Sequence, residues 1–257
     1  MVDPATAMGM VMKQSRPSKT LPLWDIHSHV LPGIDDGSKN WDITLQMMME
    51  SWKSGVRTIV ATPHHLPWKD PIPGAQIKAL CEEARARFQD KYEHFMRVLP
   101  GQELYYHSGL TDDLATGKCL TLNDTDVVLV EFSTKVTYED LLRDLRELEQ
   151  AGYTVILAHL ERYACLRESM EYVEELLDEG VLLQSNVQEA GSSLFDKDQR
   201  WLRRLYKDRL IQFVASDMHN LTVRHPITIE DVDWFRKSVD RRYFNELFQK
   251  NAEELIL

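Results

Sequence analysis

The 257-residue sequence is poor in cysteine and in basic charge. Its three cysteines, Cys81, Cys119 and Cys165, form no C-x-x-C pair, which argues against a disulfide framework and favours a reducing compartment such as the cytoplasm. Acidic residues outnumber basic ones 41 to 30, giving a net charge of −11, so we expect no nucleic-acid partner. No apolar run approaches the ~20 residues that span a bilayer, so we expect no membrane insertion.

The sequence also lacks internal repeats and any linker rich in glycine, serine or proline after residue 20. We therefore expect one domain over residues 21–257. Residues 1–20 carry their basic side chains late, which is the reverse of the order in a signal peptide. We interpret residues 1–20 as a disordered N-terminal extension.

Apolar runs with strand character alternate with helical patterns along residues 21–257. Strands are predicted at 23–30, 56–62, 96–99, 126–132, 153–158, 181–186 and 210–216. Helices are predicted at 41–54, 75–95, 138–151, 168–179 and 197–209, with further helical segments to the end. This alternation predicts an α/β fold with right-handed βαβ units, and the number of units favours a closed or distorted barrel. The segment 65–74 is the most loop-like stretch and a candidate lid.

The first predicted strand carries an H-x-H motif, His27 and His29. Side chains at positions i and i+2 of a strand point the same way, so both imidazoles can reach one point in space. An acidic loop follows, including Asp36. The pair alone is equally compatible with a half-exposed strand that carries two histidines.

Further His, Asp and Glu residues follow the carboxyl ends of five other predicted strands, where active sites of α/β barrels collect. They are His64, Glu103, Glu131, His159, Asp217 and His219. Glu131 ends a run that is expected to be buried, and a buried carboxylate needs a charge partner or a metal. With His27, His29 and Asp36 the set has nine members and no thiol. Such a set suits a cluster of two or three Mn, Fe or Zn ions, which acts on phosphoesters by clamping both oxygens of an in-line displacement.

Six ordered segments carry a family resemblance: DIHSHVLPGIDDGS (25–38), SGVRTIVATPHH (54–65), GQELYY (101–106), VLVEFS (128–133), TVILAHLERY (154–163) and VASDMHNL (214–221). They resemble the polymerase and histidinol phosphatase (PHP) superfamily. Within it they are most similar to the manganese-dependent tyrosine phosphatases of capsule and exopolysaccharide biosynthesis, the CpsB/YwqE type. The resemblance implies a distorted (β/α)7 PHP-type barrel with its metal site at the carboxyl ends of the strands.

The resemblance also implies roles for individual residues. One metal would be bound by His27, His29, Glu103 and Asp217. A second would be bound by Glu103, Glu131 and His159, and a third by Asp36, His64 and His219. Arg162 and Arg224 match positions of phosphate-binding arginines. The family often has Ser and a basic residue around the histidine at position 64, where this chain has Pro63 and His65. We expect His65 to be a plain loop histidine, and the alternative is that it supports a ligand or contacts the substrate.

The implied reaction is hydrolysis of phosphotyrosine by a metal-bridged hydroxide, with Mn²⁺ as the first expectation and Fe or Zn as the second. The implied substrate is the tail of a bacterial tyrosine kinase that regulates polysaccharide synthesis. Two alternatives stay open: a PHP phosphatase for a small ester resembling histidinol phosphate, and a catalytically silent barrel that serves as a binding module. A homo-oligomer is also left open.

Cysteine chemistry is a further alternative, because Cys81 and Arg87 have the C-x5-R spacing of cysteine phosphatases. That mechanism needs a glycine-rich loop whose amides cradle phosphate. Here the intervening residues are helix formers and include two glutamates. We therefore expect no catalytic role for Cys81.

Overall fold

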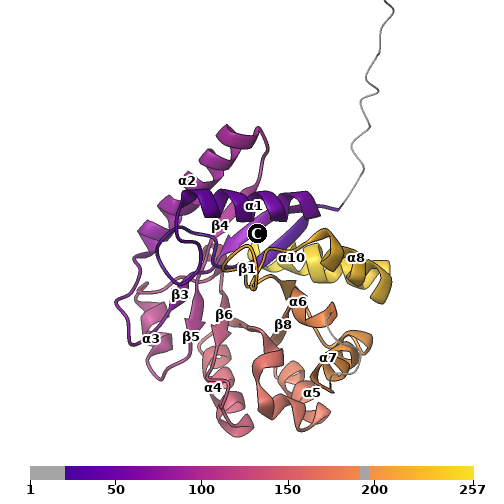
Figure 1. Ribbon diagram of the computed structural model, residues 1–257. Helices are drawn as coiled ribbons and strands as arrows, with labels where there is room; N and C mark the ends of the chain where they lie inside the picture. The colour runs from indigo at the N-terminus through magenta and orange to yellow at the C-terminus, as the bar shows by residue number, and fades with distance from the viewer. Residues whose placement is uncertain (1–20, 192–196) are drawn as a thin grey trace, which may run out of the picture.

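The computed structural model describes residues 21–191 and 197–257, and the predicted extension at 1–20 lies outside this range. Parallel strands form two adjoining sheets (Figure 1). The first has the order β1 (Leu23–Ser28), β2 (Val56–Ala61) and β4 (Arg97–Pro100). The second has the order β3 (His64–His65), β5 (Glu103–Tyr105), β6 (Val127–Glu131), β7 (Thr154–Leu157), β8 (Leu182–Asn186) and β9 (Phe213–Ala215).

The last strand returns to the first, and this contact closes the barrel. Ser28, the last residue of β1, forms an isolated parallel bridge with Met218, which follows the end of β9. Ser216 donates two hydrogen bonds to the buried carboxylate of Asp25, from its backbone N–H at 2.9 Å and from its hydroxyl at 2.6 Å. The first and last strands, which are far apart in sequence, therefore meet side by side in the barrel.

Helices surround the strands (Figure 1). They are α1 (Trp41–Ser54), α2 (Gly74–Tyr92), α3 (Leu110–Ala115), α4 (Tyr138–Gln150), α5 (Met170–Asp178), α6 (Val187–Gly191), α7 (Lys197–Lys207), α8 (Ile229–Ser238), α9 (Arg241–Asn245) and α10 (Asn251–Ile256). A π-helical turn, Glu246–Lys250, joins α9 to α10, and 3-10 turns lie at Leu122–Asp124, Leu160–Arg162 and Ala164–Arg167. None of the described helices is long and apolar enough to cross a bilayer.

Local chemistry explains where the helices begin and end. Asn40 caps α1 by accepting a hydrogen bond from the N–H of Ile43, and Gly55 ends the helix at φ 107°. Thr228 and Asp231 form a reciprocal capping box at the start of α8. The predicted helix 41–54 is confirmed residue for residue, since both of its end signals are strong.

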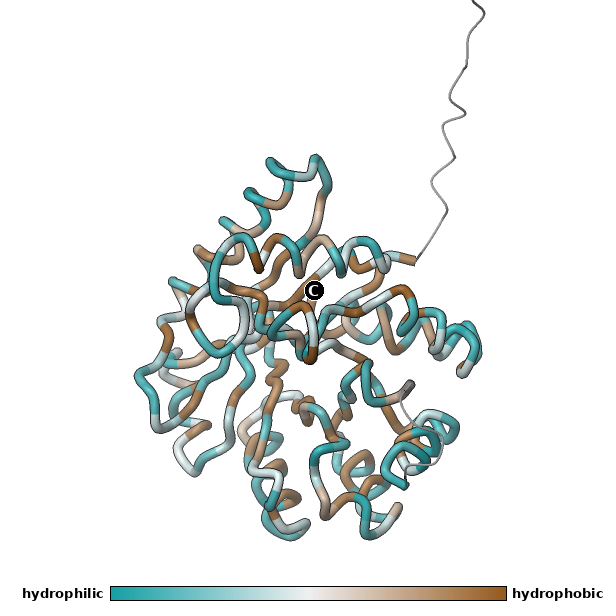
Figure 2. Tube along the Cα trace, in the orientation of Figure 1, coloured by the Kyte–Doolittle hydropathy of each residue, from teal (hydrophilic) through white to brown (hydrophobic). Residues whose placement is uncertain are grey.

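Two apolar layers hold the barrel together. An outer layer packs between strands and helices, and an inner cluster fills the barrel with Trp24, Ile26, Val60, Leu122, Val127, Leu129, Ile156, Ala158, Phe213, Ala215, Ala252 and Ile256. The last two residues come from α10, which therefore packs into the barrel interior. β6 is hydrophobic up to Glu131 at its carboxyl end, whereas the outer helices alternate in hydropathy (Figure 2). The inner cluster closes the barrel on one side and leaves the carboxyl ends of the strands for polar groups.

The α/β barrel prediction is confirmed, with differences around two short strands. His64 lies on β3 and Glu103 on β5, and neither strand was predicted. Pro63 lacks an N–H and so ends the ladder of β2 before His64. Gly101 separates β4 from β5 at a position where a Cβ would lie 2.7 Å from a methyl carbon of Leu122. The backbone thus crosses from the first sheet to the second at two places, once just before His64 and once just before Glu103.

Candidate metal centre

The strands bring all nine predicted ligands together at their carboxyl ends. On β6, Val127 and Leu129 face the inner cluster and Glu131 follows in the same alternation. On β9, Phe213 and Ala215 lead to Asp217 in the same way. The apolar interior of the barrel therefore continues directly into a layer of His, Asp and Glu side chains.

A four-residue cluster lies at the centre of this layer, formed by His27, His29, Glu103 and Asp217. The Nε2 atoms of His27 and His29 lie 3.4 Å apart, and each is 3.2 Å from a Glu103 oxygen and 3.4 Å from Asp217 Oδ1. Ligands of a tetrahedral ion with bonds of about 2.05 Å lie about 3.3 Å from one another. The donor atoms of this buried cluster thus have the separations of ligands around one ion.

A second cluster shares Glu103. His159 Nε2 lies 2.8 Å from Glu103 Oε1 and 3.6 Å from Glu131 Oε2. His64 Nδ1 lies 2.9 Å from Glu103 Oε2 and 3.3 Å from Glu131 Oε1. Glu103 therefore stands between two groups of donors, as a bridging carboxylate would.

A third cluster lies toward solvent. Asp36 Oδ1 is 3.3 Å from the Nε2 atoms of both His64 and His219. The ring of His219 stacks on that of His29 at a centroid distance of 3.8 Å. Asp36 is half exposed, whereas His219 is buried, so this cluster opens the centre to the surface.

Unpaired atoms supply a test of whether the site fits metal ions. His64 Nδ1 and Glu103 Oε2 are 2.9 Å apart, yet both are buried without a hydrogen bond. Buried polar atoms normally have a hydrogen-bond partner, so these two atoms together require a partner that the described residues do not supply. Two buried polar atoms that converge without a well-aligned hydrogen bond fit a shared cation, and the mixed N and O donors suit Mn, Fe or Zn.

The pKa values of side chains in this layer also indicate a site for cations. Burial lowers the pKa of His64, but Asp36, Glu103 and Glu131 oppose it and raise this pKa to about 12. Burial likewise disfavours the charged form of His159, while Glu103 and Glu131 raise its pKa to about 9. Burial would raise the pKa of Glu103, but His27 and His159 hold it well below its usual value. The carboxylates are thus balanced by protonated imidazoles, and divalent cations can replace those protons.

Unusual backbone conformations place two of the ligands. His159 adopts φ 34° and Asp217 φ 51°, in the left-handed region that non-glycine residues rarely occupy. Ala158 faces the inner cluster, so regular alternation would turn His159 away from it. The left-handed backbone at His159 instead lets its imidazole reach Glu103. Strain of this kind concentrates at functional sites.

A close backbone approach positions His29 from the other side. A Cβ on Gly37 would lie 2.2 Å from the carbonyl oxygen of His29, so no side chain fits there. Asp35 Oδ2 lies 2.7 Å from His29 Nδ1, and Asp35 Oδ1 accepts from the N–H of Gly37. Sequence reasoning missed Asp35, although the acidic pair at 35–36 gave a signal for it.

Strand β8 contributes a supporting network that sequence reasoning also missed. The Gln184 side-chain oxygen lies 3.1 Å from His27 Nδ1 and accepts the backbone N–H of His159 at 2.9 Å. Its amide donates to Asn186 Oδ1, and the Asn186 amide donates to Asp217 at 3.1 Å. Because the Gln184 side-chain oxygen can only accept, His27 Nδ1 donates to it, and Nε2 is the ring nitrogen that faces Glu103 and Asp217.

Both predicted arginines adjoin the ligands. Arg162 donates to the second oxygen of Asp217. Arg224 Nη1 lies 2.8 Å from His219 Nε2, and Arg224 Nη2 donates to Asp36 at 3.2 Å. Their side chains are 35% and 39% exposed, so both can meet a ligand that enters from solvent.

A further group of possible ligands, His65, His107 and Asp113, lies outside this layer. His65 is 2% exposed on β3 and bonds Asp113 at 3.2 Å, so the prediction of a plain loop histidine was wrong. Lys118 also donates to Asp113, at 2.9 Å, and the N–H of Gly109 occupies His107 Nδ1. Asp113 is therefore surrounded by donors, and this group tethers β3 to α3.

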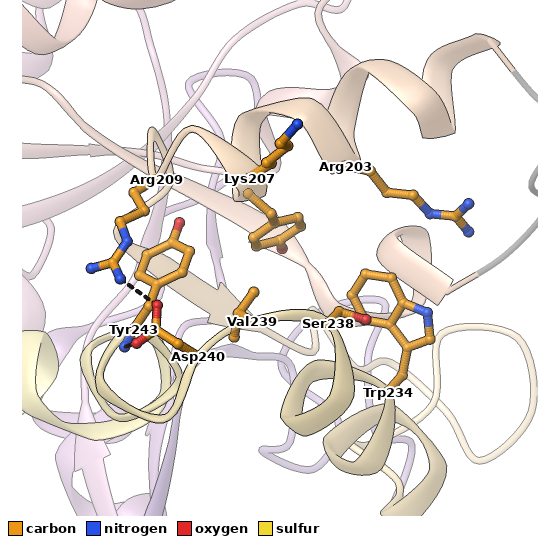
Figure 3. Close-up of a pocket in the computed structure, with 9 residues that line it drawn as sticks. Arg203, Lys207, Arg209, Trp234, Ser238, Val239, Asp240 and Tyr243 are labelled. Atoms are coloured by element: carbon orange, nitrogen blue, oxygen red, sulfur yellow. Dashed lines mark hydrogen bonds and ion pairs between the residues drawn. The ribbon is translucent and has the colours of Figure 1, made fainter.

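One cavity and one thiol of the described chain lie away from the metal centre. A cavity of about 420 Å³ is lined by residues of α7, α8, α9 and the segments that follow α7 and α8, and none of the nine ligands lines it (Figure 3). Its Arg209 is paired with Asp240, as the dashed line shows. Cys81 is buried within α2, where burial raises the pKa of its thiol to about 12, so it is no nucleophile.

Comparison with known proteins is decisive for the family. A family model described as "Capsular polysaccharide synthesis, CpsB/CapC" matches residues 23–257. The chain belongs to the CpsB/CapC family. Tyrosine-protein phosphatase CpsB from Streptococcus agalactiae is 34% identical over 237 residues, which cover 90% of this chain and 97% of that protein. Tyrosine-protein phosphatase YwqE from Bacillus subtilis is 33% identical over 204 residues, covering 78% and 79%.

Solved structures agree with this membership in the CpsB/CapC family. One described as YwqE from Bacillus subtilis and CpsB from Streptococcus pneumoniae, unique metal-dependent tyrosine phosphatases, is similar with a TM-score of 0.81. It is 30% identical, and the match covers 91% of this chain and 94% of that one. A phosphotriesterase homology protein from Escherichia coli, 11% identical with a TM-score of 0.59, shares the fold alone.

Proposed function

We propose that this chain is a metal-dependent protein-tyrosine phosphatase. The observation that carries the proposal is the set of overlapping donor clusters joined through Glu103, with Arg162 and Arg224 at its edge. Membership in the CpsB/CapC family, whose relatives are named tyrosine-protein phosphatases, supports the same reaction.

The nine side chains would hold two or three divalent ions, with Mn²⁺ as our first expectation. When bound, such ions lower the pKa of a coordinated water and neutralise phosphoryl charge. The first site would use His27, His29, Glu103 and Asp217. The second would use Glu103, Glu131 and His159, and the third Asp36, His64 and His219.

The chain's own groups bind and orient the ester. Arg162 and Arg224 are partly exposed beside the clusters, and their planar donors can bind phosphoryl oxygens and stabilise the charge that develops in the transition state. The phenol of tyrosine has a pKa of about 10, so its departure needs little help from an acid. The apolar inner cluster lies directly beneath, and it keeps water from approaching through the barrel.

We further propose that the substrate is a phosphotyrosine protein, the tail of a bacterial tyrosine kinase that regulates capsule or exopolysaccharide synthesis. The three described cysteines are free thiols, which fits a cytoplasmic location. We treat residues 21–257 as one PHP-type domain, supported by the family match from residue 23 to 257.

Metal analysis and phosphatase assays test the proposal together. We expect at least two divalent ions per chain in purified protein and hydrolysis of a phosphotyrosine peptide that a chelator abolishes and Mn²⁺ restores. His159→Ala should lose most of this activity, because it removes a donor that lies 2.8 Å from Glu103. Fewer than two ions, or an unaffected variant, would contradict the cluster. Faster turnover of a small phosphate ester than of the peptide would favour a metabolite phosphatase instead.

A further inference from the structure

An exposed aromatic side chain stands beside the metal centre. Trp68 lies in the loop after β3, four residues beyond His64, and is 62% exposed. Its ring meets Tyr105 edge-on, at a centroid distance of 4.7 Å and an interplanar angle of 74°. An exposed tryptophan is common on its own, but this one belongs to a pair next to a polar centre.

Tyr105 points toward the mouth of the barrel. Glu103 faces the donor clusters, Leu104 belongs to the outer apolar layer, and Tyr105 returns to the side of Glu103 by strand alternation. Its backbone pairs with that of Glu131 on β6. Tyr105 therefore lies on the same face as Glu103, just beyond it toward solvent.

The next residue confirms this orientation. Tyr106 stacks on Phe132 at 5.0 Å and donates its hydroxyl to Glu147 of α4, which lies outside the barrel. Adjacent residues of an extended chain point to opposite faces. Tyr105 and Trp68 therefore form an aromatic pair on the open side of the centre.

We propose that Trp68 and Tyr105 bind the aromatic ring of the leaving group. This inference rests on the proposed function, which places the phosphoryl group at the donor clusters. A phosphoryl group at Glu103 directs the rest of the ester outward, past Tyr105. A ring in that position packs against the faces or edges of the pair, as aromatic rings do in proteins. An alkyl ester offers no such contact, so the pair selects tyrosine over serine and threonine.

Binding of two phosphonates measures this contact without catalysis. Phenylphosphonate and methylphosphonate carry the same acid group and differ in the ring. We expect Trp68→Ala to weaken the binding of phenylphosphonate to manganese-loaded protein by about two- to tenfold in calorimetric titrations, the range of one aromatic contact. Methylphosphonate affinity should stay unchanged. Tyr105→Ala should have the same selective effect, and Trp68→Phe should restore part of the loss.

Phe95 supplies a matched control. It is 58% exposed and precedes β4, so it lies at the amino end of the strands, away from the mouth. Phe95→Ala should change neither affinity. Equal losses for both phosphonates in Trp68→Ala, or no loss at all, would overturn the inference. Selective loss with no phosphotyrosine hydrolysis by the wild type would refute the proposed function and leave the aromatic site standing.

Discussion

Gln184→Leu tests whether strand β8 orients the metal ligands. Gln184 is fully buried, and its oxygen is shared between His27 Nδ1 at 3.1 Å and the N–H of His159 at 2.9 Å. Leucine has a similar size and offers no acceptor. The substitution therefore leaves two buried donors unpaired while it keeps most of the packing.

The magnitude follows from those two donors. A buried donor without a partner costs about 1–3 kcal/mol, so the pair costs about 2–6 kcal/mol of folding free energy. This is a large part of the about 5–15 kcal/mol that stabilises a typical domain. Loss of a group that orients a metal-bound histidine also weakens metal affinity by about 10–100-fold. The second effect separates an orienting role from a merely structural one.

The assay compares metal affinity by competition with a chromophoric chelator and thermal unfolding of the same samples. Gln212→Leu is the matched control, because Gln212 accepts the N–H of Leu183 on the same strand at 2.9 Å but does not reach the ligands. Both variants should lose stability, and only Gln184→Leu should lose metal affinity. Equal metal affinity in the two folded variants would refute the reasoning.

Three further predictions concern the arginine, the thiol and the imidazoles. Arg162→Ala should lower kcat/KM by about 100-fold, as loss of one transition-state donor does. Arg162→Lys should recover only part of this loss, because a lysine cannot form two parallel hydrogen bonds. Equal rates for the two variants would argue against phosphate binding by Arg162. Cys81→Ser should keep full activity in the same assay, since the thiol is buried within α2, and a dead variant would overturn the metal mechanism. Manganese binding should release protons and tighten as pH rises, because raised pKa values (about 12 for His64 and about 9 for His159) keep both imidazoles protonated at neutral pH in the metal-free protein. Calorimetry in buffers of different ionisation enthalpy measures this release, and a binding enthalpy that is independent of buffer would contradict it.

The alternation of strands and helices and the ends of α1 could be predicted from sequence because their signals are local. Asn40 and Gly55 act on their own helix, and helical spacing marks the buried face between them. The positions of Glu131 and Asp217 also follow from alternation along a buried strand. Their neighbours in space could be anticipated because parallel strands end at one side of a barrel.

The parts that escaped prediction depend on distant segments. β3 and β5 are too short to show a period, and they exist because β3 pairs with β5 and β5 with β6. His65 resembled a loop residue until α3 brought Asp113 to it. The role of Gln184 is invisible in the local sequence, since its partners His27 and His159 lie 157 and 25 residues away.

Closure of the barrel by β1 and β9 has a consequence for biosynthesis. Asp25, two residues before His27, is bonded to Ser216, and 191 residues separate them. A ribosome adds about 5–20 residues per second, so about 10–40 s pass between synthesis of the first ligands and of Asp217. During that interval His27 and His29 form an incomplete chelate on a nascent chain. Loading of the first site must follow translation of β9, so metal selection is a property of the finished chain and of the ions around it.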